Sequence, residues 1–147
     1  MREILFRGKR EDNGEWVEGF YACVLDSHYI ITGRFDSLTN GIINSEAYKV
    51  DPETIGQFTG VMDTNGRKIF EGDIVRLTDE PNEFEWTAVI TFGNPNGWYD
   101  WGWQLKPIGG FDGNKAILFW VDMEDAGAYC EIIGNIHDNP ELLEVSE

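Results

Sequence analysis

Residues 55–75 read IGQFTGVMDTNGRKIFEGDIV and contain three turn signals set between apolar segments. Asn65-Gly66 supplies the positive backbone torsions that a tight reversal requires. Because apolar residues lie on both sides of this reversal, we expect a β-hairpin with strands at 57–62 and 67–70. This hairpin is the feature around which we expect the rest of the chain to be organised.

A second sharp turn is predicted immediately after the hairpin. Gly72 is followed by Asp73 and then by a new apolar segment, residues 74–78, which reads as another strand. A hairpin followed by such a diverging turn is typical of the start of an SH3-like barrel. Asn65, Gly66, Gly72 and Asp73 are therefore expected to act as structural turn residues, and the freedom of glycine at position 72 favours a role in the fold.

A family resemblance rests on three blocks of sequence. They are the central segments QFTG (57–60), DTNG (63–66) and IFEGDIV (69–75), the start REILFRGK with NGEWVEG (2–9 and 13–19), and the end IIGNIHDNPELL (132–143). These blocks are similar to the YopX family of bacteriophage and prophage proteins, whereas residues 80–129 do not align. The resemblance implies a small, mostly β, phage-encoded protein with an SH3-like region. It supplies no catalytic or binding residues, because no activity is established for the family.

The composition is that of a folded protein. The 147 residues fit one domain, or one domain with a small subdomain, and suffice to bury roughly two-thirds of the unfolded surface. Hydrophobic residues make up 41% and aromatic residues 14% of the chain, which is enough to form a core despite the charge. We find no basic-then-apolar leader and no long apolar run, so we expect a cytoplasmic location in the bacterial host.

The net charge of −16 is unevenly distributed. Residues 1–76 hold 9 bases and 13 acids, whereas residues 77–147 hold 2 bases and 14 acids, a net charge of −12. Because phosphate contacts are made by lysine and arginine, we do not expect direct nucleic-acid binding by the second half. Its acids either keep the protein soluble, which is the favoured interpretation, or imitate phosphates and make the protein a DNA mimic.

The N-terminal residues 1–50 are predicted to form an antiparallel β subdomain. Strand patterns at 4–9, 16–25 and 28–33 indicate a meander, and residues 35–48 show no regular pattern. The bases of the first segment could form a binding patch, but neighbouring acids favour cross-strand ion pairs on a solvated edge; these bases are Arg2, Arg7, Lys9 and Arg10.

Residues 51–147 are predicted to form the SH3-like barrel region, and together with the subdomain they make up one family unit. Asp51 and Pro52 predict a capped helical turn before the hairpin. Further strands are expected at 86–92, 115–121 and 129–136, followed by a short C-terminal helical turn at 139–143.

The sequence WYDWGW at 98–103 is the densest aromatic segment. On a strand, Tyr99, Trp101 and Trp103 would share one face. Core packing is the favoured interpretation, followed by self-association, with stacking on a ligand third. These three residues are the candidate interface.

Residues with catalytic or metal-binding chemistry are few and far apart. We expect buried thiols at Cys23 and Cys130, and structural or surface histidines at His28 and His137, since neither pair has a metal-ligand or redox spacing. The acids at 122–125 lack a nucleophile or partner base, so a solvated loop is favoured over acid–base chemistry. We therefore assign no catalytic, cofactor-binding or metal-binding residues, and no cofactor.

Three functional hypotheses follow. The first is a non-enzymatic phage accessory protein that acts by binding a host protein or by self-association as a homo-oligomer. The alternative is an acidic DNA-mimic inhibitor of a host DNA-handling or defence enzyme. An enzyme is the third, and it would require a deep pocket with converging polar groups.

Overall fold

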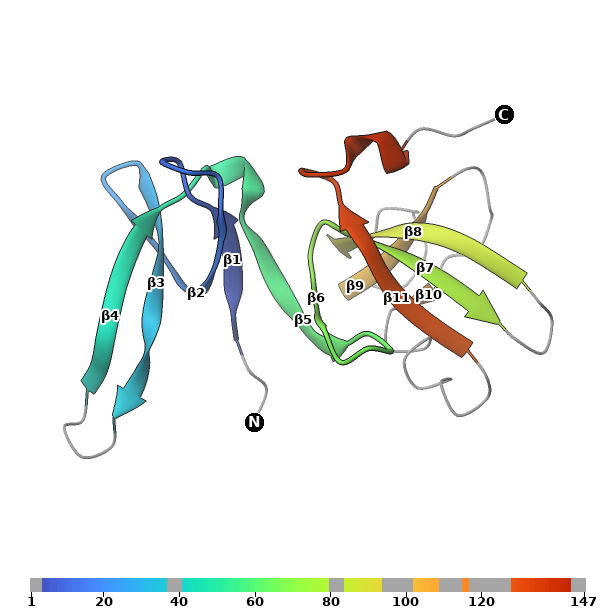
Figure 1. The fold of residues 1–147 in the computed structure, drawn as a ribbon, viewed down its shortest axis with the longest axis horizontal. Coiled ribbons are helices and arrows are strands. Elements are labelled where there is room, and N and C mark those ends of the chain that lie inside the picture. Colours follow the sequence, from blue (N-terminus) through green and yellow to red (C-terminus); the bar gives the residue numbers. More distant parts are fainter. Residues whose placement is uncertain are drawn as a thin grey trace. The chain divides into compact units, whose positions relative to one another are not determined.

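The computed structural model describes residues 4–36, 41–79, 84–93, 102–108, 115–116 and 128–143. The chain divides into two compact units, Met1–Phe58 and Thr59–Glu147 (Figure 1). Both are built from antiparallel β-strands, which confirms the prediction of a mainly β protein. The sequence predicts a boundary after residue 50. In the structure the boundary falls within a strand, whose first residues pair with the N-terminal strand.

The strands of the first unit belong to a six-stranded sheet in the order β4-β3-β2-β1-β5-β6, of which β6 and the end of β5 lie in the second unit. The elements of the first unit are β1 (Phe6–Lys9), β2 (Trp16–Val24), β3 (Ser27–Asp36), β4 (Gly41–Lys49), the 3-10 turn η1 (Pro52–Thr54) and the start of β5 (Gly56–Met62). The predicted antiparallel meander is confirmed. Residues 35–48, for which the sequence pattern predicted no definite structure, include β4, which pairs with β3 from Tyr29↔Lys49 to Asp36↔Gly41.

The sheet of the first unit curls back on itself at one end. An isolated antiparallel bridge, Arg10↔Val50, joins the end of β1 to the end of β4. The curl is possible because Gly8 and Gly19 have no side chains: a Cβ on Gly8 would lie 3.0 Å from a Val50 methyl, and one on Gly19 would lie 2.2 Å from the Ile31 carbonyl oxygen. Among the described residues of this unit, the buried apolar side chains are Ile30, Val50 and Phe58.

The predicted helical turn at Pro52 is confirmed. The Asp51 carboxylate accepts a hydrogen bond from the Glu53 amide, and proline occupies the first helical position. The Thr54 hydroxyl accepts from the Lys9 amide and donates to the Asp51 carbonyl, so the turn is fastened to β1.

The second unit contains a five-stranded antiparallel sheet in the order β10-β9-β8-β7-β11. Its strands are β7 (Asp73–Asp79), β8 (Phe84–Gly93), β9 (Gly102–Pro107), β10 (Lys115–Ala116) and β11 (Ala128–Asn135). The end of β5 is followed by β6 (Lys68–Phe70), which confirms the predicted hairpin, and the chain ends in the 3-10 turn η4 (Pro140–Leu143). The described strands do not close a barrel, so the SH3-like detail stays a prediction.

Alternating side chains of the five-stranded sheet form the core of the second unit. Val75 of β7 lies opposite Ala88 of β8 on one side and Ile132 of β11 on the other, and Leu77 lies opposite Cys130. Directly paired residues in antiparallel strands share a face, so these side chains form one apolar surface. The buried residues of this core are Val75, Leu77, Ala88, Ile90, Leu105 and Cys130 of the five-stranded sheet, together with Ile69 of β6. Within the described ranges, no helix is both long enough and apolar enough to cross a membrane.

Candidate functional site

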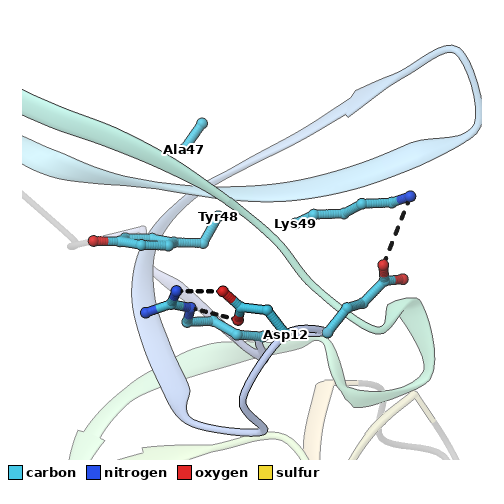
Figure 2. Close-up of a pocket in the computed structure, with 6 residues that line it drawn as sticks. Asp12, Ala47, Tyr48 and Lys49 are labelled. Carbon is cyan, nitrogen blue, oxygen red and sulfur yellow. Dashed lines mark hydrogen bonds and ion pairs between the residues drawn. The ribbon is translucent and has the colours of Figure 1, made fainter.

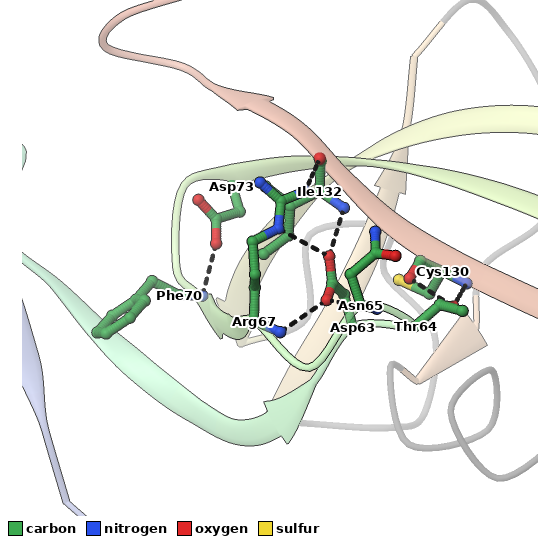
Figure 3. A network of polar contacts seen from close by, with 8 residues as sticks. All are labelled: Asp63, Thr64, Asn65, Arg67, Phe70, Asp73, Cys130 and Ile132. Carbon is green, nitrogen blue, oxygen red and sulfur yellow. Dashed lines mark hydrogen bonds and ion pairs between the residues drawn. The ribbon is translucent and has the colours of Figure 1, made fainter.

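The central hairpin is held by a buried carboxylate (Figure 3). The Asp63 side chain is 0% exposed and accepts hydrogen bonds from the amides of Asn65, Arg67 and Ile132, at 3.0, 2.8 and 3.1 Å. The Arg67 guanidinium lies 3.4 Å from the same carboxylate and also donates to the Ile132 carbonyl. Asp63 thus fastens the β5–β6 turn to β11, a role that sequence reasoning missed because the partner is far along the chain.

The neighbouring residue makes a second connection to the same strand. The backbone amide and the hydroxyl of Thr64 both donate to the Cys130 carbonyl, at 2.8 and 3.0 Å. The Cys130 amide donates to the Thr64 hydroxyl at 3.1 Å. Burial raises the pKa of the Cys130 thiol to about 12, so this group stays protonated at neutral pH.

The second predicted turn, at Gly72, is held mainly by hydrogen bonds of the backbone. Gly72 has φ of 91°, its amide donates to the Ile90 carbonyl, and its carbonyl accepts from the Ile136 amide, both at 2.9 Å. The buried Asp73 carboxylate accepts from the Phe70 amide at 2.8 Å. Gly66 in the hairpin turn has φ of 80°. These contacts all lie within the second unit's own strands and turns, so they serve the fold of that unit.

The aromatic candidate interface is only partly described by the structure. Trp103 is half-buried, packs against the core of the second unit and contacts Phe92 edge to face, with ring centroids 5.0 Å apart. Tyr99 and Trp101 lie outside the described residues, as do the acids Asp122, Glu124 and Asp125.

The two cysteines differ in exposure. Cys130 is buried as predicted, but the same prediction is wrong for Cys23, which is exposed on β2 beside the hairpin end. The His28 ring stacks on Tyr21 with centroids 5.8 Å apart and is hydrogen-bonded to its hydroxyl. Within the described ranges, no three His, Cys, Asp or Glu residues lie close enough together to hold a metal ion.

An exposed apolar turn lies at the end of the β2–β3 hairpin. Leu25 and Asp26 form it with φ of 48° and 66°, in the left-handed region that glycine and asparagine usually occupy. Leu25 is 94% exposed, Val24 56% and Phe20 51%. We call Phe20, Val24 and Leu25 the apolar tip. Sequence reasoning missed it because the turn contains neither glycine nor asparagine.

A pocket of about 470 Å³ lies between the β1–β2 turn and β4 (Figure 2). The Arg10 guanidinium lies over the Tyr48 ring, 4.4 Å from its centroid, and makes two hydrogen bonds to the Asp12 carboxylate. The hydrogen bond from Arg10 holds the pKa of Asp12 below its ordinary value. The other lining residues are Glu11, Ala47 and Lys49.

Among the described charged residues at this pocket, all except Glu46 form an ion pair. The Lys49 ammonium lies 3.6 Å from the Glu11 carboxylate, and Arg10 is paired with Asp12. Glu46, next to the pocket, accepts a hydrogen bond from the Tyr48 hydroxyl. That hydrogen bond is the main reason why the pKa of Tyr48 is raised.

Comparison with known proteins identifies a family and related solved structures. A family model described as "YopX protein" matches residues 5–144. A crystal structure of protein EF1440 from Enterococcus faecalis is similar, with a TM-score of 0.50 and 24% sequence identity, over 98% of this chain and 100% of that chain. At this identity the likeness concerns the fold alone. No curated protein matches the sequence.

Proposed function

Since this chain belongs to the YopX family, we propose that it is a phage- or prophage-encoded accessory protein that acts by binding another protein chain and not by catalysis. The binding surface that we propose is the apolar tip of the first unit. The partner is a host protein or a second copy of the chain.

The observation that carries this proposal is the conformation of Leu25. Its φ of 48° is unfavourable for a branched apolar side chain, and its 94% exposure means that it contributes almost nothing to the core. Backbone strain of this kind costs on the order of 1–3 kcal/mol and is concentrated at functional sites. Burying a leucine side chain in a partner would contribute about 1.5–3 kcal/mol. Binding therefore accounts for a residue that folding does not.

The remainder of the first unit supports such a contact. Phe20 and Val24 lie four positions apart on β2, so they share a face of the strand, with Ala22 between them. Exposed aromatic and aliphatic side chains that lie together are typical anchors of protein interfaces. In this proposal the second unit is an SH3-like scaffold, and the aromatic residues Tyr99, Trp101 and Trp103 are a second candidate contact.

The DNA-mimic hypothesis is the second candidate, and it rests on charge. Residues 77–147 have a net charge of −12, whereas residues 1–76 have −4. A mimic would bind a nucleic-acid-handling protein mainly through exposed charges, so its binding would weaken steeply as salt rises. Binding through the apolar tip would change much less with salt.

The test is an affinity capture from host lysate at low and at high salt, with light scattering on the purified protein. Leu25→Asn combined with Asp26→Gly removes the apolar side chain and supplies the preferred hairpin turn. Asp26→Gly alone is the matched control, because it relieves strain but keeps Leu25.

We expect the double variant to melt no lower than the wild type and to lose the captured partner or the oligomer, while the control retains it. If the wild type, the control and the double variant capture the partner equally, the partner does not bind through the apolar tip. A partner held only at low salt, and held equally by the double variant, would favour the mimic.

A further inference from the structure

The outer edge of β4 is defined by the hydrogen-bond alternation of its pairing with β3. The Val50 amide donates to the His28 carbonyl at 2.9 Å, which makes His28 and Val50 a hydrogen-bonded pair. In an antiparallel ladder every second pair is of this kind, so Tyr48 and Glu46 also bond to β3. The backbone groups of Lys49 and Ala47 therefore point away from β3, toward the outer edge.

The residues at the end of β1 bond to the outer edge of β4 only near Lys49. The Lys49 carbonyl accepts from the Glu11 amide at 3.0 Å, and the Asp51 amide donates to the Lys9 carbonyl at 2.9 Å. The chain then reverses, since the Gly14 amide donates to the Arg10 carbonyl and the Arg10 amide donates to the Glu15 carbonyl. In the part of the chain that the structure describes, no strand continues the track of β1 alongside Ala47.

The pocket lies beside Ala47, where a continuation of β1 would run. Ala47 lines it together with residues of the β1–β2 turn, and its volume of about 470 Å³ exceeds that of a single large side chain. An open strand edge next to a side-chain pocket is the arrangement with which proteins bind extended peptides: main-chain hydrogen bonds give affinity, and the pocket selects a side chain.

We infer that the open edge of β4 is a binding site for an extended, basic segment of a partner polypeptide, which adds to the first unit as a strand beside Ala47. This site is separate from the apolar tip, and the inference rests on the proposed function only in its general claim that the protein binds protein.

The basic character of the partner follows from the charges at the edge. Arg10 is paired with Asp12 and Lys49 with Glu11, so among the described charged residues of this edge the Glu46 carboxylate is the one that remains without an ion pair. Glu46 and Tyr48 are two residues apart on the strand and share a face.

A lysine or arginine of the added strand would place its charge at Glu46 and its aliphatic stem along the Tyr48 ring. The net charge of −16 attracts a basic segment from a distance. A second copy of this chain would bring the same negative excess to the edge and is disfavoured.

The experiment uses two capped synthetic peptides of about nine residues, the length of a long strand, one alternating lysine with valine and the other alternating glutamate with valine. Each carries a fluorophore, and fluorescence anisotropy at low salt measures its affinity for the full chain. Ala47→Pro removes the outward amide hydrogen without removing a bond to β3, since proline is tolerated on a strand edge. Glu46→Lys reverses the charge and serves if the proline variant does not fold.

We expect the lysine peptide to bind the wild type and to lose at least about tenfold in affinity with either variant. The glutamate peptide should bind only Glu46→Lys. Equal binding of both peptides to the wild type, no binding of the lysine peptide, or unchanged affinity in a folded Ala47→Pro variant would each overturn the inference.

The two proposals fail in different ways. Lysate capture that is lost with the Leu25→Asn/Asp26→Gly variant but unchanged in Ala47→Pro and Glu46→Lys, with no peptide binding, would refute the edge site and leave the apolar tip in place. If the Leu25→Asn/Asp26→Gly variant still binds the peptide and still captures the same lysate protein, the apolar tip is refuted and the edge site stands.

Discussion

Replacement of Asp63 by alanine is expected to lower the free energy of unfolding of the second unit by about 2.5–5 kcal/mol. The carboxylate accepts three amide hydrogen bonds, and a hydrogen bond to a charged group contributes roughly 1.5–3 kcal/mol. The full contribution of roughly 1.5–3 kcal/mol is expected only for the amide of Ile132, because Ile132 is half-buried. The amides of Asn65 and Arg67 belong to exposed residues and can bond to water, so their loss is expected to cost about 0.5–1 kcal/mol each.

Urea unfolding followed by tryptophan fluorescence and far-UV circular dichroism measures this change. Asp63→Asn should be intermediate, because its remaining oxygen can still accept from Asn65 and Arg67 while its amide nitrogen faces the Ile132 amide. The matched control is Asp12→Ala, which removes an exposed carboxylate paired with Arg10 and should leave the unfolding midpoint nearly unchanged.

The reasoning fails if Asp63→Ala lowers the stability by less than about 1 kcal/mol while Asp12→Ala behaves as expected, since an unsatisfied buried amide should cost more than that. Native-state hydrogen exchange gives a second reading. The Ile132 amide should exchange faster in Asp63→Ala than in the wild type, and unchanged protection would mean that water or another group replaces the carboxylate.

Three further predictions concern other residues. Gly19→Ala should lower the melting temperature of the first unit far more than Gly14→Ala, because its Cβ would lie 2.2 Å from a carbonyl oxygen, whereas Gly14, with φ of 73°, has open space and only a torsional cost of about 1 kcal/mol. Stability should fall by about 1.4 kcal/mol per pH unit as pH rises from 9.0 toward about 12, because the folded chain keeps the Cys130 proton and the unfolded chain releases it. Urea titrations at successive pH values should show this slope in the wild type, and Cys130→Ala should lack it. Glu46→Ala should lower the pKa of Tyr48, since the carboxylate stabilises the protonated phenol, and ultraviolet absorbance during a pH titration of the two proteins measures the difference.

The parts of the fold that were predicted correctly depend on local chemistry. Asn65-Gly66 specifies its reversal by backbone torsions alone, and Asp51 with Pro52 specifies a capped turn within four residues. β4 was not predicted, because Asn44 and Ser45 interrupt any apolar alternation and the strand is stabilised by its pairing with β3. That pairing is a property of the folded chain and leaves no periodic signal in the segment itself.

The candidate surfaces were not visible in the sequence for a similar reason. The strain at Leu25 appears only as a backbone torsion: Asp26 and Ser27 are compatible with a turn between the predicted strands, but no residue type there signals the left-handed conformation of Leu25. The pocket beside Ala47 exists because the Arg10↔Val50 bridge brings β1 against β4 before β1 reverses. Cys23 was predicted to be buried because cysteine usually is, but its place on the outer part of β2 leaves it exposed.

The long separation between Asp63 and β11 has a consequence for synthesis of the chain on the ribosome. The pairing partners of β1 to β4 have all been made by residue 58, so the first unit can fold early. β7, by contrast, lacks its neighbour β11 until residues 128–135 are made, roughly 50 residues and about 3–10 s of translation later. Throughout that interval the nascent chain presents an unpaired strand edge and two turn residues, Asp63 and Thr64, without their partners. A product truncated before residue 128 would retain the first unit's pairings together with an edge prone to aggregation.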